Sequence, residues 1–304
     1  YEMDCTAIDS SKRYTFISNH RDIVLDSAIL DVLLVDNKFT TTCEIAIGDN
    51  LLSLPWVKDL VRVNKAFIVE RALSMRQMLM SSKRLSDYMH FAVKEKNENI
   101  WIAQREGRAK DSDDRTQKSI LQMMAMGGEG SIIERLKQLH LVPLSISYEY
   151  DPCDYLKAKE FQQKRDDPDF VKSQRDDLLS METGILNNKG RVHFTLTSPI
   201  NDQLAQLDPN MEKNELIAAI ASIIDKEIYK HYRFYPCNYV AYDMLTGTRR
   251  FSEHYGLKDK KQFEDYLQGQ LDKIVLPNKD EAFLRTKILE MYTNPLKNFF
   301  ANQE

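Results

Sequence analysis

The sequence predicts an α/β fold in which a mostly parallel sheet is flanked by helices and followed by a helical C-terminal appendage. Short apolar runs recur through the first two thirds of the chain, and segments with apolar residues at helical spacing separate most of them. Strands that alternate with helices favour parallel pairing. After about residue 235 only helical patterns remain. We therefore expect a main domain at 1–235 and an appendage at 236–304.

Six runs have the composition of buried strands, because β-branched and aromatic residues are frequent in them. The first, YTFIS at 14–18, is typical of the set. In chain order the expected strands are 14–18, 43–47, 66–69, 99–104, 141–148 and 192–197.

Helices are expected where apolar residues recur three to four positions apart. In chain order these segments are 22–35, 74–95, 116–138, 154–178 and 212–232, with 260–276 and 280–292 in the appendage. The 154–178 segment has many charged residues and few apolar positions, so we expect it to lie on the surface.

The composition argues against several classes of protein. With 304 residues, 42% of them hydrophobic and 29% charged, the chain is long enough for one large domain with an appendage. Its four cysteines lie far apart, which indicates neither a zinc cluster nor a disulfide framework and fits a reducing compartment. The sequence has no apolar run long enough to span a membrane and no signal peptide. Because the chain begins at a tyrosine, we expect that an N-terminal segment is missing.

Charged and aromatic residues are unevenly distributed. The net charge is −4, yet residues 58–84 contain seven basic and two acidic side chains. That segment is either a solvated helix face or a site for phosphate groups or anionic lipid. Aromatic residues at 229–242, interleaved with basic ones, either rest at a membrane interface or hold the appendage on the main domain. Nucleic acid is not an expected partner, since the basic residues do not alternate with stacking aromatics.

The first candidate for chemistry is His20, at the junction between the 14–18 strand and the helix that follows. Ligands usually bind at the carboxyl ends of parallel strands, so this position favours a functional role. Asp22 and Asp26 lie close behind and could orient the ring. A histidine beside an aspartate is also a common structural pair, and the motif alone leaves both interpretations open.

Two further blocks follow expected strands. Arg71 comes directly after the 66–69 strand, where a planar guanidinium is suited to phosphate, although it could equally pair with Glu70. Glu106, Gly107 and Arg108 follow the 99–104 strand. There the glycine permits a tight turn and the charged side chains can contact a polar substrate, although the loop could also be an ordinary charged turn.

The order and spacing of these blocks resemble the glycerolipid acyltransferase family, which includes glycerol-3-phosphate and lysophosphatidate acyltransferases. Four residues separate the histidine from the aspartate in that family, whereas five separate His20 from Asp26. The family's Glu-Gly-Thr-Arg motif is similar to Glu106-Gly107-Arg108 without the threonine.

Two other motifs extend the resemblance. Residues 66–71 look like the family's Ala-Phe-Phe-Ile-x-Arg, and residues 142–146 look like its Val-Pro-Val-x-Ile. The resemblance covers about residues 13–232 and, given the departures in spacing, indicates a divergent branch.

The resemblance implies an O-acyltransferase of phospholipid biosynthesis. Such an enzyme moves a fatty acyl group from a thioester, on coenzyme A or acyl carrier protein, to a hydroxyl of glycerol-3-phosphate or lysophosphatidate. His20 would be the general base, and Arg71, Glu106, Gly107 and Arg108 would form the acceptor pocket. The mechanism requires no metal or cofactor. We expect a cytoplasmic protein, peripheral on the inner face of an anionic membrane. The alternatives are an acceptor without phosphate, such as a lyso-aminolipid, and a non-catalytic module that binds lipid or protein.

The histidine's partner is expected to be Asp26. In an extended segment, Asp22 would point to the same side as His20 and would be its partner. In a strand-to-helix turn, Asp22 is a natural helix cap, which leaves Asp26 one turn inside the helix to reach back to His20. The apolar stretch of Met75, Met78, Leu79 and Met80 either lines an acyl groove or belongs to the core.

Overall fold

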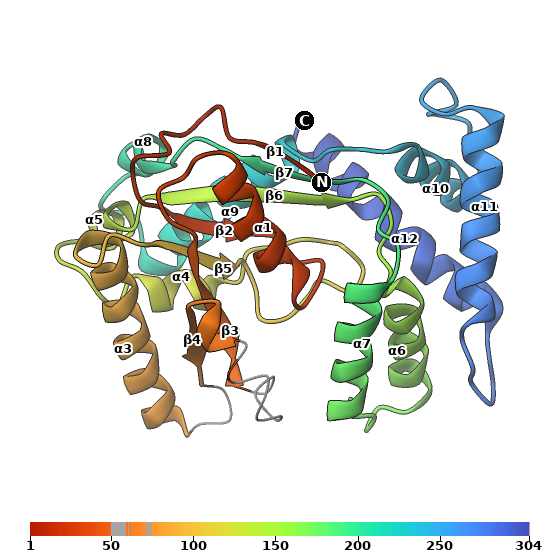
Figure 1. The fold of residues 1–304 in the computed structure, drawn as a ribbon, viewed down its shortest axis with the longest axis horizontal. Helices are drawn as coiled ribbons and strands as arrows, with labels where there is room; N and C mark the ends of the chain where they lie inside the picture. Colours follow the sequence, from red (N-terminus) through yellow and green to blue (C-terminus); the bar gives the residue numbers. More distant parts are fainter. Residues whose placement is uncertain (50–58, 60, 71–73, 304) are drawn as a thin grey trace.

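The fold is built on one sheet (Figure 1). The computed structural model describes residues 1–49, 59, 61–70 and 74–303. In the described chain, seven strands pair in the order β1-β7-β6-β2-β5-β3-β4, and every neighbouring pair except β6 with β7 is parallel. The strands are β1 Glu2–Asp4, β2 Thr15–Ser18, β3 Cys43–Gly48, β4 Ala66–Val69, β5 Asn99–Ala103, β6 Leu141–Tyr148 and β7 Val192–Leu196. The predicted mostly parallel α/β fold is confirmed, with β1 as a strand that the sequence did not predict.

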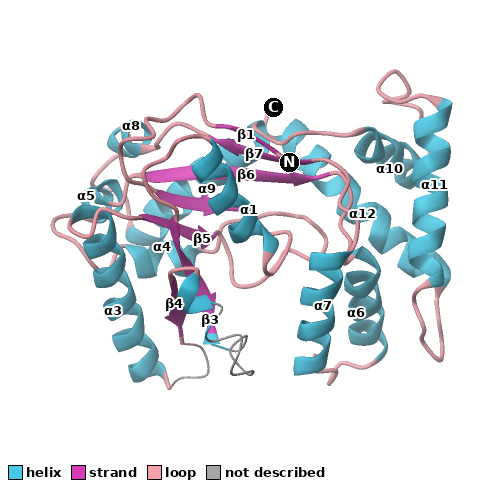
Figure 2. Ribbon diagram, in the orientation of Figure 1, coloured by secondary structure: helices cyan, strands magenta, loops and turns pink. Residues whose placement is uncertain are grey.

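Helices connect these strands and then follow them to the C-terminus (Figure 2). Those within the sheet region are α1 Leu25–Asp36, α3 Met75–Lys94, α4 Lys118–Met124, α5 Ile132–Gln138, α6 Asp154–Asp166, α7 Gln174–Leu186 and α8 Asn201–Ala205. The last four are α9 Lys213–Lys230, α10 Pro236–Thr246, α11 Leu257–Asp272 and α12 Glu281–Ala301.

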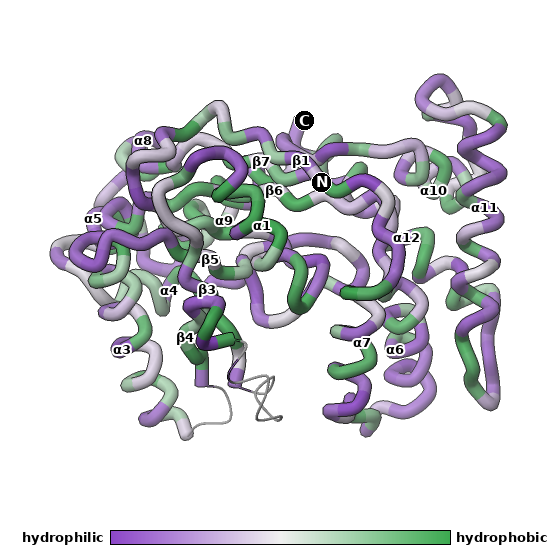
Figure 3. The backbone as a smooth tube through the Cα atoms, in the orientation of Figure 1, coloured by the Kyte–Doolittle hydropathy of each residue, from purple (hydrophilic) through white to green (hydrophobic). Residues whose placement is uncertain are grey.

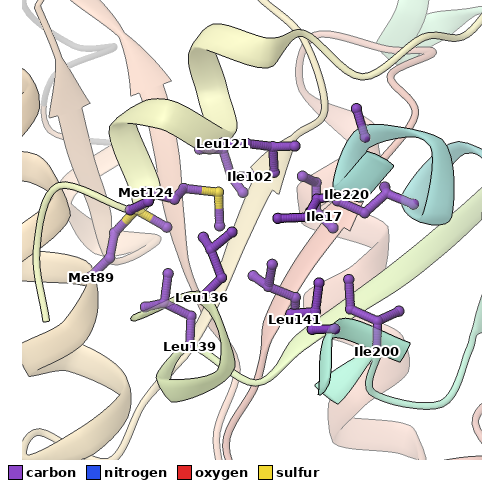
Figure 4. Close-up of a cluster of buried hydrophobic side chains, with 14 of the residues drawn as sticks. Ile17, Met89, Ile102, Leu121, Met124, Leu136, Leu139, Leu141, Ile200 and Ile220 are labelled. Carbon is purple, nitrogen blue, oxygen red and sulfur yellow. The ribbon is translucent and has the colours of Figure 1, made fainter. Parts of the chain in front are cut away.

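The central strands bury both faces, because successive side chains of a strand point to opposite sides of the sheet. On one face, Phe16 and Trp101 pack in a cluster with Leu30 and Leu34 of α1. On the other face, Ile17 packs in a second cluster with residues from α3, α4, α5 and α9, part of which is drawn in Figure 4. Helix α1 is correspondingly apolar along most of its length, whereas the outer helix α11 is mainly hydrophilic (Figure 3).

Two expected helices are each divided in two. The 116–138 pattern forms α4 and α5, separated by a turn in which Gly128 and Gly130 adopt positive φ. The 154–178 pattern ends at Asp166 and resumes at Gln174, with Pro168 between them, which cannot continue a helix. The expectation that this second segment lies on the surface is wrong in part, because α6 buries Asp154, Lys157 and Glu160 through polar contacts that its composition does not reveal.

The C-terminal helices pack against α6 and α9. Asp154, on α6, accepts hydrogen bonds from Tyr266 of α11 and Tyr292 of α12, each at 2.8 Å. Burial and the charge of Asp151 raise the pKa of Asp154 to about 7. In the aromatic segment at 229–242, Phe234 packs edge-on against Phe299 of α12. These contacts favour the interpretation in which the aromatic residues hold the C-terminal helices in place.

Candidate active site

His20 and Asp26 form a hydrogen-bonded pair at the carboxyl end of β2. His20 Nδ1 lies 2.8 Å from Asp26 Oδ2. The side chain of Asp26 is 0% exposed and that of His20 is 12% exposed, so the pair is shielded from water except at the ring edge. The same carboxylate oxygen accepts the backbone N–H groups of Arg21 and Asp22, at 2.6 and 3.1 Å. Asp26 is therefore fixed by the turn itself and holds one ring nitrogen, while Nε2 has no partner in the described chain.

Asp22 has the capping role that the sequence argument assigned to it. Its Oδ1 accepts the backbone N–H groups of Val24 and Leu25, at 2.9 and 2.8 Å. Burial and the neighbouring charge of Asp26 raise the pKa of Asp22. The extra residue between histidine and aspartate is accommodated in this turn, because Asp26 lies in the first turn of α1 and reaches back to His20.

Two neighbouring side chains orient the histidine. The side-chain amide of Asn19 hydrogen-bonds to the backbone of β6 in the way that a peptide group of a neighbouring strand does. It donates to Ile146 O at 2.9 Å and accepts from Ile146 N at 2.8 Å. Trp101 of β5 packs edge-on against the His20 ring, with 5.6 Å between centroids, and its Nε1 donates to Ser18 Oγ. The direction of the chain on both sides of His20 is thus set by the sheet.

His20 lies on the wall of a cavity of about 910 Å³. Glu106, Gly107 and Arg108 line the same cavity, as do Val69 and Glu70 at the end of β4. The structure therefore brings the histidine together with the loop after β5 and with the end of β4, as the sequence motifs predicted. Arg71 itself lies outside the described residues.

Two guanidinium groups face this cavity without a protein partner. Arg105 and Arg108 form no hydrogen bond or ion pair within the described part of the chain, although Arg105 Nε and one terminal nitrogen of Arg108 are buried. Gly107 between them has φ +67°, a backbone conformation that favours glycine and turns the loop back on itself. Arg108 interacts electrostatically with Asp22 and Asp151, but neither guanidinium group has a hydrogen-bonded carboxylate in the described chain. Two partly buried cationic groups of this kind make this end of the cavity suitable for an anion.

Sequence reasoning did not single out Arg105, although it belongs to the same loop as Arg108. Lys110 also lines the cavity, but it is paired with Glu160. Arg115 is exposed and bound to Asp113 at 3.1 Å, outside the cavity lining. Of the four α3 residues considered for an acyl groove, only Met78 lines the cavity.

The loop after β5 is anchored behind the histidine by a buried ion pair. Arg21 binds Asp114 through two hydrogen bonds of 3.0 and 2.6 Å, and Tyr232 of the segment after α9 donates to Asp114 at 2.5 Å. A bidentate pair fixes both the distance and the orientation of the two loops. The residue next to His20 is thus tied to the loop that carries Arg105 and Arg108.

Helix α7 forms a further wall of the cavity, which the sequence analysis did not predict. Asp177, Met181 and Ile185 lie at helical spacing along its cavity side. Gly184 of the same helix packs directly on Asp22, since a Cβ at this position would lie 2.1 Å from Asp22 Oδ2. Gly184 lies beyond the helix expected at 154–178, so the expected elements gave no signal for this contact.

No cluster of three or more His, Cys, Asp or Glu residues suited to a metal ion is found among the described residues. Within the same residues, none of the helices combines the length and apolarity needed to cross a bilayer.

Comparison with known proteins agrees with the motifs. Residues 5–147 match a protein-family model described as acyltransferase. One similar solved structure is the 1-acyl-sn-glycerophosphate acyltransferase PlsC from Thermotoga maritima, with 12% sequence identity and a TM-score of 0.37 over 75% of this chain and 70% of that one. No curated protein matches the sequence significantly.

Proposed function

We propose that this chain, whose residues 5–147 match an acyltransferase family model, transfers a fatty acyl group from a thioester to a hydroxyl of glycerol-3-phosphate or lysophosphatidate. The observation that carries this proposal is the His20–Asp26 pair on the wall of a cavity that also contains two guanidinium groups with no hydrogen-bond partner among the described residues.

His20 is the general base in this proposal. An alcohol is a poor nucleophile at neutral pH, so its proton must be removed as its oxygen attacks the thioester carbonyl. His20 Nε2 takes that proton, while Asp26 holds Nδ1–H and stabilises the imidazolium that forms. The carbon–sulfur bond then breaks, and the thiolate leaves with the proton from His20. The products are an ester and a free thiol, so the proton that left the alcohol ends on the sulfur.

Arg105 and Arg108 bind the acceptor's phosphate in this proposal. Both guanidinium groups lie on the cavity that His20 also lines, and neither is hydrogen-bonded to a protein carboxylate in the described chain. We assign Arg71 to the same anion from the family resemblance and its position after β4. Glu106 shapes the pocket, and Gly107 allows the backbone to approach the ligand.

The acyl chain occupies the apolar part of the cavity. Ile45 and Ile47 of β3, Val69 of β4, and Met78 and Leu85 of α3 lie on this side. The donor thioester is carried by coenzyme A or by acyl carrier protein, and the enzyme acts at the cytoplasmic face of an anionic membrane.

A second candidate acceptor is a lyso-aminolipid, because carboxylates share the cavity with the guanidinium groups. Asp111 and Asp177 line it together with Lys172, which is bound to Asp177 at 2.5 Å. Such a mixed lining could also hold a headgroup with an amine. A non-catalytic module that binds lipid or protein is the candidate from another class.

One panel of reactions distinguishes these candidates. Purified protein is incubated with labelled acyl-CoA or acyl-acyl carrier protein and with glycerol-3-phosphate, lysophosphatidate or a lyso-aminolipid. We expect saturable ester formation with a phosphate-bearing acceptor. Ester formation only with the aminolipid would replace the proposed acceptor, and the absence of thioester consumption with every acceptor would contradict a catalytic role.

A further inference from the structure

We propose that the first turns of α3 dock on an anionic phospholipid surface, so that the cavity opens directly into the lipid. The proposal deepens the proposed function by naming the surface through which lipid substrates would arrive. The biological role of this docking rests on the proposed function, but the docking itself can be measured without any transfer reaction.

The beginning of α3 is apolar and exposed. Met75, Met78, Leu79 and Met80 are between 53% and 84% exposed, although α3 contributes Met89, Ala92 and Val93 to the core near its other end. Figure 1 shows this first part of α3 extending beyond the sheet, on the side where β3 and β4 end. Four large apolar side chains concentrated on two turns are uncommon on a monomer surface and are typical of an interaction site. We refer to Met75, Leu79 and Met80 as the apolar tip.

The charge around the apolar tip fits phosphate headgroups. Helix α3 carries four basic side chains and one acidic one. Arg76 lies next to Met75 of the apolar tip and has no ion pair in the described chain. One to two turns later, Lys83 pairs with Asp87 and Arg84 pairs with Glu70. Basic side chains next to exposed Met and Leu match a bilayer interface, where acyl chains lie beneath phosphates. Methionine is flexible and adapts to a fluid surface.

The same helix also lines the cavity. Met78, Ser82 and Leu85 recur at helical spacing on the cavity wall, and Met75 and Leu79 lie beside this row. An acyl chain that leaves the bilayer at the apolar tip therefore meets Met78 and Leu85 on its way toward His20. Docking elsewhere on the molecule would require the chain to cross water.

Co-sedimentation with vesicles tests the proposal. The variant Met75→Ser/Leu79→Ser/Met80→Ser removes the tip without touching residues that line the cavity. The control is Leu257→Ser/Val275→Ser, which changes strongly exposed apolar side chains at the start of α11 and in the loop that follows it. With vesicles of equimolar phosphatidylcholine and phosphatidylglycerol, we expect the wild type and the control to bind and the triple variant to bind at least about tenfold more weakly.

Three results would overturn the docking surface: no binding by the wild type, equal binding by the triple variant, or a wild-type dimer in light scattering that the triple variant dissociates. A fourth readout separates this proposal from the enzymatic one. Transfer to a dispersed short-chain acceptor should be unchanged in the triple variant. If neither the wild type nor the triple variant transfers acyl groups but vesicle binding still depends on the apolar tip, the docking surface stands and the proposed function fails.

Discussion

At the scale of single residues, the turn after β2 gives two similar carboxylates different tasks. Asp22 binds the backbone at the start of α1, whereas Asp26 binds the histidine. The sequence favoured this distinction, because the capping preference of aspartate at a helix start is local and leaves the second carboxylate one turn away, but only the structure shows which aspartate contacts the ring. It was not sufficient for Arg105, whose position on the cavity wall depends on how the loop after β5 folds.

Substituting the two aspartates separates their roles. Asp26→Asn should lower the rate of acyl transfer on the order of 10²- to 10⁴-fold, because the ring loses the acceptor that fixes its tautomer. Asp22→Asn keeps an oxygen for the cap and should lower the rate less than about tenfold. Because burial and Asp26 raise the pKa of Asp22, removing its charge should leave the free energy of unfolding unchanged or increase it. Steady-state kinetics and urea unfolding measure both; a greater loss of rate in Asp22→Asn would reverse the assignment.

Removing the guanidinium groups tests the anion site. Arg105→Gln and Arg108→Gln should each raise the KM for a phosphate-bearing acceptor about tenfold or more, since a charge-assisted hydrogen bond contributes roughly 1.5 to 3 kcal/mol. The KM for the thioester donor should change little. Arg115→Gln, a change to an exposed arginine outside the cavity, is the control. Unchanged acceptor dependence in both cavity variants would exclude phosphate binding by this loop.

At the scale of elements, α7 shows what the sequence could not reveal. The helical segment predicted to lie on the surface ended at residue 178, so Met181 and Ile185 lie beyond it, and only the folded chain places them on the cavity. The periodicity of apolar residues predicted most strand and helix positions up to β7, because these elements bury either one face or all of their side chains. The division of the long helical patterns, and the short β1, depended on turns and tertiary pairing that local patterns do not specify.

The contact of α7 with the catalytic turn predicts a position-specific effect of alanine. Gly184→Ala should lower the free energy of unfolding by about 1 to 3 kcal/mol, because the new methyl group overlaps Asp22 Oδ2 and the cap holds that side chain in place. Gly269→Ala in α11 meets no atom within 4 Å and should raise stability by roughly 0.5 to 1 kcal/mol. Thermal melting of the two variants checks this, and a stabilised Gly184→Ala would show that α7 does not press on Asp22.

At the scale of the whole molecule, a buried carboxyl joins the sheet region to the C-terminal helices. The pKa of Asp154 is raised from 3.8 to about 7, so the folded state holds its proton more tightly than the unfolded chain does. Its contribution to stability is therefore greatest below about pH 4 and is lost as the pH rises to about 7, an effect of up to roughly 4 kcal/mol.

Urea unfolding of wild type and Asp154→Asn at pH 5 and pH 8 tests this linkage. Asparagine keeps an oxygen for Tyr266 and Tyr292 but does not ionise, so the variant should gain stability relative to wild type as the pH rises. A stability difference that is the same at both pH values would show that Asp154 does not titrate in this range. The sequence alone gave no indication of this linkage, because the carboxyl's partners come from helices more than a hundred positions away.

The central claim is that His20 removes a proton from the acceptor hydroxyl. Its most direct test is the rate of ester formation by His20→Ala, measured with labelled acyl-CoA and a phosphate-bearing acceptor, on protein whose thermal unfolding matches that of wild type. The account predicts a loss on the order of 10²- to 10⁴-fold. A variant that keeps its fold and transfers the acyl group within about tenfold of the wild-type rate would contradict it.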